Sequence, residues 1–309
     1  MNIKKILYPI IYYSGLNCLY SKFLNRKLFV IMYHSISSNR DNFLISKDLY
    51  KNVSIDVNMF EKQMNYLKEN GHTFISFSDL EKLDLNKINK PTIIYFDDGF
   101  KDVLLNAVPV MNKLNIRSTI FLVSGIFNET DMLWTILLRR VLGKKGLSIS
   151  KQNNIIEELK YKMDSQRLEY MKQYSVADHK ELFDLFMNKA DIVYLSNSGH
   201  DFGSHSVTHP RLSEASSEVV KYEITESKFQ VEKLISKKIN SFSFPYGRTT
   251  DNMLSDLEKA GYKYVVSKGK GLNDVVNIRK GVIFLKNISP KPTDSLMLFK
   301  LRLYFLNII

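Results

Sequence analysis

Short apolar runs alternate with longer amphipathic stretches along this chain of 309 residues. The runs are rich in β-branched and aromatic residues, which is typical of strands, and turn-forming residues follow several of them. Strands that alternate with helices predict βα units around a parallel sheet. The expected strands cover Leu28–His34, His72–Phe77, Thr92–Asp98, Ser118–Ser124, Asp201–Ser206, Ser241–Tyr246, Tyr262–Ser267 and Val282–Lys286.

Between several of these runs, apolar residues recur three or four positions apart, which is the spacing of a helix with one buried face. Strands and helices in this order and number favour a closed or nearly closed barrel. The expected helices cover Asn58–Asn70, Lys101–Leu114, Ser213–Ser236 and Thr250–Ala260.

One region breaks the alternation. About 70 residues separate the strand expected at Ser118–Ser124 from the next, whereas a simple βα return needs far fewer. Asp131–Leu142, which carries the only tryptophan, and Asn153–Lys189 both have helical patterns. We therefore expect a helical insertion at about 128–195 that covers one end of the barrel, either as a lid that shapes the substrate site or as additional packing.

Composition and charge narrow the classes of function. With 44% hydrophobic residues the chain can form one sizeable core. The 44 Lys and Arg outnumber the 32 Asp and Glu. The resulting net charge of +12 favours anionic polymers, anionic lipid headgroups or nucleic acid as binding partners. The basic residues are scattered and no nucleic-acid-binding signature accompanies them, so we expect no nucleic-acid partner. Cys18 is the only cysteine, which excludes an intramolecular disulfide and a thiolate metal site.

Two terminal segments, 1–27 and 291–309, flank the expected domain at 28–290. The first is apolar, but Pro9 and Gly15 interrupt it, and it falls short of the roughly 20 apolar residues that a membrane span requires. It also lacks a small-residue cleavage site. Each segment is expected either to dock on the protein or to make a peripheral membrane contact. We expect a cytoplasmic location, at most at the inner face of the membrane; the oligomeric state is open.

The apolar run that begins at Thr92 stops at two adjacent carboxylates, Asp97 and Asp98, which Gly99 follows. In parallel α/β folds, ligands bind at the carboxyl ends of the strands. Successive side chains on a strand diverge, so the two carboxylates can face one cavity and take different roles. Asp-Asp-Gly also forms ordinary turns, and the motif alone does not establish a site.

Two imidazoles, His205 and His209, follow the strand expected at Asp201–Ser206. Pro210 disfavours a helical conformation at His209, which places the pair on a strand end and loop. Two surface histidines beside a turn are one interpretation. Together with Asp98, however, two neutral imidazoles and a carboxylate make a facial metal site with open positions for water and substrate.

A third strand ends in Pro245, Tyr246 and Gly247. This turn is either a plain strand exit or part of the same face of the barrel. In the second case it supplies a backbone N–H for an oxyanion and an aromatic wall for a sugar ring.

These three segments resemble the polysaccharide deacetylase family, the NodB-homology group of carbohydrate esterases (family 4-like). The TFDDG element of the family is matched by Tyr95–Gly99, its H-S/T-x-x-H-P element by His205–Pro210, and its R-x-P-Y-G element by Ser243–Gly247. The resemblance covers about His34 to Ile288, the insertion aside, and implies a distorted (β/α)7 barrel.

The resemblance also implies the role of each matched residue. The site would hold a divalent metal, most simply Zn²⁺ on ligand type, with Co²⁺, Ni²⁺ or Fe²⁺ also compatible. The implied roles are base for Asp97, metal ligands for Asp98, His205 and His209, and substrate or oxyanion contacts for Pro245 and Tyr246.

The chain departs from the family pattern in two places. Ser243 stands where many members have an arginine that orients the base, and Arg279 is a candidate replacement, against the alternative of a surface arginine. No histidine follows His209 to serve as the late general acid. His34, which ends an early strand after Tyr33, resembles the Tyr-His element of a biofilm-polysaccharide branch of the family and is expected to donate the proton instead.

The implied reaction removes an N-acetyl group from an amino sugar of a surface polysaccharide or its precursor. The partner is then an N-acetylated glycan, whose identity the sequence does not specify. One alternative is a catalytically silent relative that binds carbohydrate, because the arginine and the late histidine are missing. A remoter one is a non-haem iron oxygenase, which uses the same ligand types but gives Asp97 no role.

Overall fold

The computed structural model describes residues 24, 26–38, 53–160, 162, 164–174, 177–250, 253–275 and 281–304. All the expected strands are present within these ranges, most of them shorter at one or both ends than the sequence suggests. They are β1 (Lys27–Tyr33), β4 (Thr73–Phe74), β5 (Pro91–Phe96), β6 (Thr119–Leu122), β7 (Asp201–Ser204), β8 (Ser241–Ser243), β9 (Tyr264–Lys270) and β11 (Ile283–Asn287).

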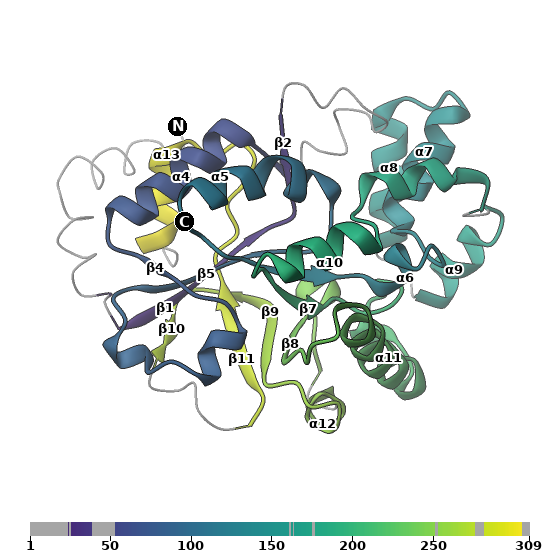
Figure 1. Ribbon diagram of the computed structural model, residues 1–309. Helices are drawn as coiled ribbons and strands as arrows, with labels where there is room; N and C mark the ends of the chain where they lie inside the picture. The colour runs from purple at the N-terminus through teal and green to yellow at the C-terminus, as the bar shows by residue number, and fades with distance from the viewer. Residues whose placement is uncertain are drawn as a thin grey trace, which may run out of the picture.

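The strands form one curled sheet in which β1, β5, β6, β7, β8, β9 and β11 follow one another as parallel neighbours (Figure 1). β4 pairs with the start of β5, ahead of the point where β6 joins it. The curl brings Ile288, just after β11, beside β1. Its N–H donates to the Val30 carbonyl and its carbonyl accepts from the Met32 N–H, each at 2.8 Å. This closure confirms the distorted (β/α)7 barrel.

Three short strands were not expected from the sequence. β2 (Ser35–Ser37) and β3 (Ser54–Asp56) form a separate parallel pair. β10 (Asn273–Asp274) pairs antiparallel with the start of β1. Each has only two or three residues, too few for an alternating pattern to be recognised.

Alternation along the strands separates two apolar clusters. Val30, Ile93 and Tyr95 belong to a cluster that fills the barrel, whereas their neighbours Ile31 and Ile94 pack outward with residues from the helices. Close filling explains a glycine in β7: a Cβ on Gly203 would lie 2.3 Å from the Phe121 ring. The same alternation carries His34 and Asp97 inward at the carboxyl end of the barrel.

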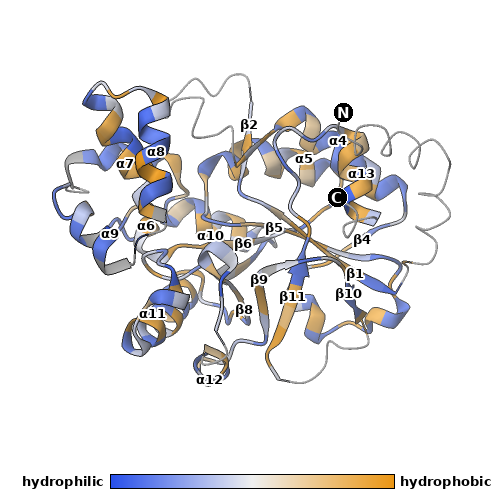
Figure 2. Cartoon of the chain, turned by 180° about the vertical axis from the view of Figure 1, so that it is seen from behind, coloured by the Kyte–Doolittle hydropathy of each residue, from blue (hydrophilic) through white to orange (hydrophobic). Residues whose placement is uncertain are grey.

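The expected helices cover the outside of the sheet. The stretch expected as one helix at 101–114 is a π-helical turn, η3 (Val103–Ala107), that continues into α5 (Val108–Lys113). In Figure 2, hydrophilic and hydrophobic residues alternate along α7 (Trp134–Lys144), α8 (Ile149–Lys160) and α11 (Ser217–Ile235), as expected for helices with one buried face. The other outer helices are α4 (Val57–Glu69), α11 (Ser217–Ile235), α12 (Met253–Lys259) and α13 (Leu296–Tyr304), with single 3₁₀ turns at η1 (Ser78–Glu81), η2 (Leu85–Lys87), η5 (Leu212–Glu214) and η6 (Pro245–Gly247).

The expected insertion is helical and forms a lobe beside the barrel (Figure 1). Its first long helix buries Trp134, Leu138 and Leu142 on one face. The elements between β6 and β7 are α6 (Ser124–Phe127), α7 (Trp134–Lys144), α8 (Ile149–Lys160), α9 (Asp164–Met171), η4 (Ala177–Leu185) and α10 (Lys189–Asn197).

The terminal segments are described only in part. Nearly all of 1–27 and the last five residues lie outside the described residues. Within the tail, α13 docks on α4: the Tyr304 and Tyr66 hydroxyl oxygens lie 3.2 Å apart, and Lys300 Nζ is 4.3 Å from the centre of the Tyr66 ring. Among the helices that the structure describes, none has the length and apolar character needed to cross a membrane.

Candidate metal centre and active site

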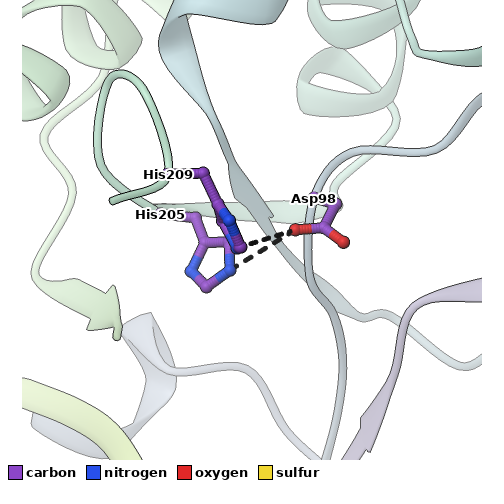
Figure 3. A group of neighbouring side chains, drawn as sticks. All are labelled: Asp98, His205 and His209. Atoms are coloured by element: carbon purple, nitrogen blue, oxygen red, sulfur yellow. Dashed lines mark ion pairs between the residues drawn. The ribbon is translucent and has the colours of Figure 1, made fainter. Parts of the chain in front are cut away.

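Three side chains from two strand ends converge at the carboxyl end of the barrel (Figure 3). Asp98 follows β5, whereas His205 and His209 lie in the loop after β7. The Nε2 atoms of His205 and His209 lie 3.4 Å and 3.5 Å from Asp98 Oδ1. The structure therefore brings together the three residues that the sequence suggested as ligands.

The contacts of the three side chains fit a cation. His205 Nδ1 lies 2.7 Å from the Ser243 carbonyl oxygen, which can only accept, so Nδ1 carries the proton and Nε2 is left to bind a ligand. Asp98 Oδ1 is buried and has no hydrogen-bond partner among the described residues. A buried carboxylate oxygen without a donor is costly unless a cation satisfies it. Two imidazole nitrogens and one carboxylate oxygen are a ligand set typical of a catalytic divalent metal.

Four residues at the site have an unfavourable backbone conformation. Asp98, Ser206, His209 and Tyr246 have φ values of 70°, 69°, 58° and 59°, in the left-handed region that side chains other than glycine rarely adopt. Each such residue costs about 1–3 kcal/mol and persists only where its surroundings hold it. These four residues all line or support one pocket, so the rest of the fold stabilises this arrangement.

Glu223 supplies part of that support. It lies on the buried face of α11, and its carboxylate accepts hydrogen bonds from the N–H groups of Val207 and Thr208 at 2.6 Å and 3.0 Å. The Thr208 hydroxyl donates to its other oxygen at 2.6 Å. Bonds of this kind to a charged acceptor are short and strong. Glu223 thereby fixes the loop that carries both histidines.

Asp97 lies beside the three candidate ligands and is only 4% exposed. Its Oδ1 has no hydrogen-bond partner among the described residues. The pKa of Asp97 is raised above its usual value, because burial outweighs the lowering effects of the His205 and His34 charges and of the Ser243 hydroxyl. Ser243 thus faces the carboxylate from the position where the family pattern has an arginine. Arg279, the other candidate for that role, lies outside the described residues.

The two imidazoles differ electrostatically. Burial would lower the pKa of His205, but the charges of Asp97 and Asp98 raise it to about 8. Burial lowers the pKa of His209 to about 3, so this ring is neutral at neutral pH. The pKa of Asp98 falls well below its usual range: burial would raise it, but the close approach of the His205 and His209 imidazoles outweighs burial.

A cavity of about 570 Å³ opens over these groups. His34, which directly follows β1, lines it together with Asp97, Tyr246 and the three candidate ligands. Leu133, Thr135 and Ile156 from the insertion form part of its wall. Its volume lies within the usual range for small-molecule sites. Another cavity, about 740 Å³, lies at the amino ends of β9 and β11, and among the described residues no group of metal-ligating side chains lines it.

A family model described as polysaccharide deacetylase matches residues 85–265, which is more than half of the chain. The chain belongs to the polysaccharide deacetylase family. The match spans β5, the histidine loop and the turn at Tyr246, which are the three segments that meet at the pocket.

Individual relatives of the family are distant. YxkH of Bacillus subtilis (strain 168), a polysaccharide deacetylase by name, is 23% identical over 249 residues, which cover 79% of this chain and 66% of YxkH, just under two thirds of its length. The poly-beta-1,6-N-acetyl-D-glucosamine N-deacetylase of Staphylococcus aureus is 22% identical over 79% of this chain and 72% of its own length. Among solved structures, the Streptococcus pyogenes deacetylase PplD in complex with acetate has a TM-score of 0.61 at 20% identity and covers 88% of this chain and 96% of PplD. This likeness supports the deacetylase fold.

Sequence reasoning missed two residues of the site in this family member. Glu223 had a visible signal, because it is an acidic residue between Val220 and Ile224 on the apolar face of an amphipathic helix. Trp134 was noticed only as the single tryptophan of the insertion. Its indole N–H donates to the Tyr246 hydroxyl at 2.7 Å, a contact that no local pattern indicates.

Proposed function

We propose that this member of the family is a metal-dependent hydrolase that removes N-acetyl groups from amino sugars of a surface polysaccharide or its precursor. The observation that carries the proposal is the approach of one carboxylate oxygen to two imidazole nitrogens, with a second buried carboxylate, Asp97, beside them in one cavity. The name of the staphylococcal relative supports an N-acetylglucosamine polymer as the class of substrate.

Asp98, His205 and His209 would hold the cation, and Zn²⁺ suits their nitrogen and oxygen donors best, although Co²⁺, Ni²⁺ or Fe²⁺ can occupy such a set. A bound divalent cation lowers the pKa of water and polarises the acetyl carbonyl group. The proton on His205 Nδ1 is held by the Ser243 carbonyl group, so the metal would bind Nε2. Nε2 can do so only in the neutral imidazole, in which it carries no proton.

The remaining steps belong to side chains and backbone of this chain. Asp97 accepts a proton from the attacking water, whose oxygen forms the new bond to the acetyl carbon. The backbone N–H of Tyr246 donates to the carbonyl oxygen as negative charge develops there. His34 donates a proton to the departing nitrogen when the carbon–nitrogen bond breaks. The products are acetate and a sugar with a free amine, which balances the atoms of one amide and one water.

The proposal is tested with a panel of N-acetylated oligosaccharides, including β-1,6-linked N-acetylglucosamine, chitin and peptidoglycan fragments. We expect protein stripped with a chelator to be inactive and protein reloaded with Zn²⁺ to release acetate and free amine in equal amounts. Binding of oligosaccharides without acetate release would instead indicate a silent relative. Consumption of oxygen without acetate would indicate an iron oxygenase.

His34→Gln tests the proton donor. Loss of a general acid is expected to lower the rate of N-deacetylation by about 10²–10⁴-fold. The same variant should hydrolyse 4-nitrophenyl acetate at nearly the wild-type rate, because that leaving group departs without a proton. Parallel kinetics on the two substrates measure the difference, with zinc content as the control. Equal losses on amide and ester would contradict the assignment.

A further inference from the structure

Side chains of the insertion contact the turn at Pro245–Gly247, whose backbone N–H at Tyr246 is the proposed donor to the oxyanion. Trp134, the first residue of α7, is 7% exposed and donates its indole N–H to the Tyr246 hydroxyl at 2.7 Å. Behind it, the guanidinium carbon of Arg167 in α9 lies 5.0 Å from the centre of the indole ring. Two helices of the insertion therefore support the tyrosine.

The Tyr246 ring in turn contacts one of the proposed metal ligands. Its centre lies 4.9 Å from that of the His209 ring, in an edge-to-face arrangement, and the Arg211 guanidinium lies 5.5 Å from it. The backbone of Tyr246 is in the left-handed region, with φ 59° and ψ 4°. Because this conformation is costly for a residue with a side chain, contacts to that side chain help to hold the turn.

We propose that Trp134 is a positioning residue: its hydrogen bond to Tyr246 fixes the turn whose N–H faces the carbonyl oxygen in the transition state. The inference rests on the proposed function and assigns the insertion a catalytic task beyond forming a wall of the cavity. Donors at an oxyanion act when the charge develops, so misplacing one affects turnover more than substrate binding.

Trp134→Phe keeps an aromatic ring near Arg167 but removes the N–H donor together with the five-membered ring that carries it. We expect kcat for acetate release to fall about 3- to 10-fold, the range that corresponds to one ordinary hydrogen bond, with KM and zinc content unchanged. Tyr246→Phe removes the acceptor and should give a similar loss. Because the two side chains act through one bond, the double variant should lose no more than either single variant.

Tyr174→Phe is the matched control, since it removes a hydroxyl in the same insertion, where the ring packs against Tyr170. It should leave kcat and KM as in the wild type. Melting temperatures identify any variant that folds poorly. If Trp134→Phe does so, the comparison of Tyr246→Phe with the wild type still tests the hydrogen bond.

Three results would overturn the inference while the proposed function stands: an unchanged kcat in Trp134→Phe, a loss confined to KM, or losses that multiply in the double variant. If the zinc-loaded wild type releases no acetate from any glycan, the proposed function itself fails, and the inference fails with it. The wild-type measurement thus separates the two failures.

Discussion

Asp97→Asn is expected to lower kcat for acetate release by about 10²–10⁴-fold, the contribution typical of a general base. Asparagine has nearly the same shape as aspartate but cannot accept a proton from water. Asp97 is 4% exposed and its Oδ1 has no hydrogen-bond partner in the part of the chain that the structure describes, so an amide there is not expected to break an existing bond at that atom. Initial rates of acetate release by the zinc-loaded variant measure the loss.

The same variant should bind zinc as the wild type does, because the three ligands remain. Asp131→Asn is a suitable control: it changes a half-buried carboxylate of the insertion, whose pKa burial also raises, and should leave kcat unaltered. Full activity in Asp97→Asn would remove Asp97 from the mechanism. A loss of zinc would reassign it as a ligand or as a support for one.

Strands such as β1, β5 and β6 were predictable because each carries a run of apolar residues that the closed sheet buries. The limits of β4 were less so. Ile75 and Phe77 are as apolar as strand residues, but they fill the barrel after the ladder with β5 has ended at Phe74. An apolar residue indicates that a position is buried, not that its backbone is paired with a neighbouring strand. The hydrophobic pattern alone therefore cannot tell where a strand ends when buried residues follow it.

The centre of the site was predictable for a related reason. Asp97 and Asp98 directly follow the apolar run of β5, and His205 directly follows β7. The carboxyl ends of parallel strands meet at one face. The contacts that support them were not predictable, because each joins side chains distant in sequence; even the acidic residue visible on the apolar face of α11 does not reveal which loop it holds. Glu223 in α11 holds the histidine loop, and Trp134 in the insertion holds Tyr246. Contacts of this kind depend on how helices pack around the barrel, and no periodicity encodes them.

Asp98→Asn is expected to abolish both metal binding and acetate release. The substitution removes the negative charge that faces two imidazole nitrogens at 3.4 Å and 3.5 Å. Changes to groups that merely orient a ligand cost 10–100-fold in affinity, so the loss of a ligand's charge should weaken zinc binding by more than about 100-fold. Asparagine tolerates the left-handed conformation at this position, where φ is 70°, so the fold should persist. Zinc content after dialysis against a weak chelator measures the effect.

Comparison with Asp97→Asn makes this prediction specific, because two adjacent and equally conservative substitutions should fail in different ways. Asp97→Asn should be an inactive protein that holds zinc, whereas Asp98→Asn should be inactive because it holds none. A large excess of Zn²⁺ should restore part of the activity of Asp98→Asn and none of that of Asp97→Asn. If Asp98→Asn retained zinc at the wild-type affinity, the three side chains would not be the metal site, and the barrel end would need another explanation for its buried carboxylates.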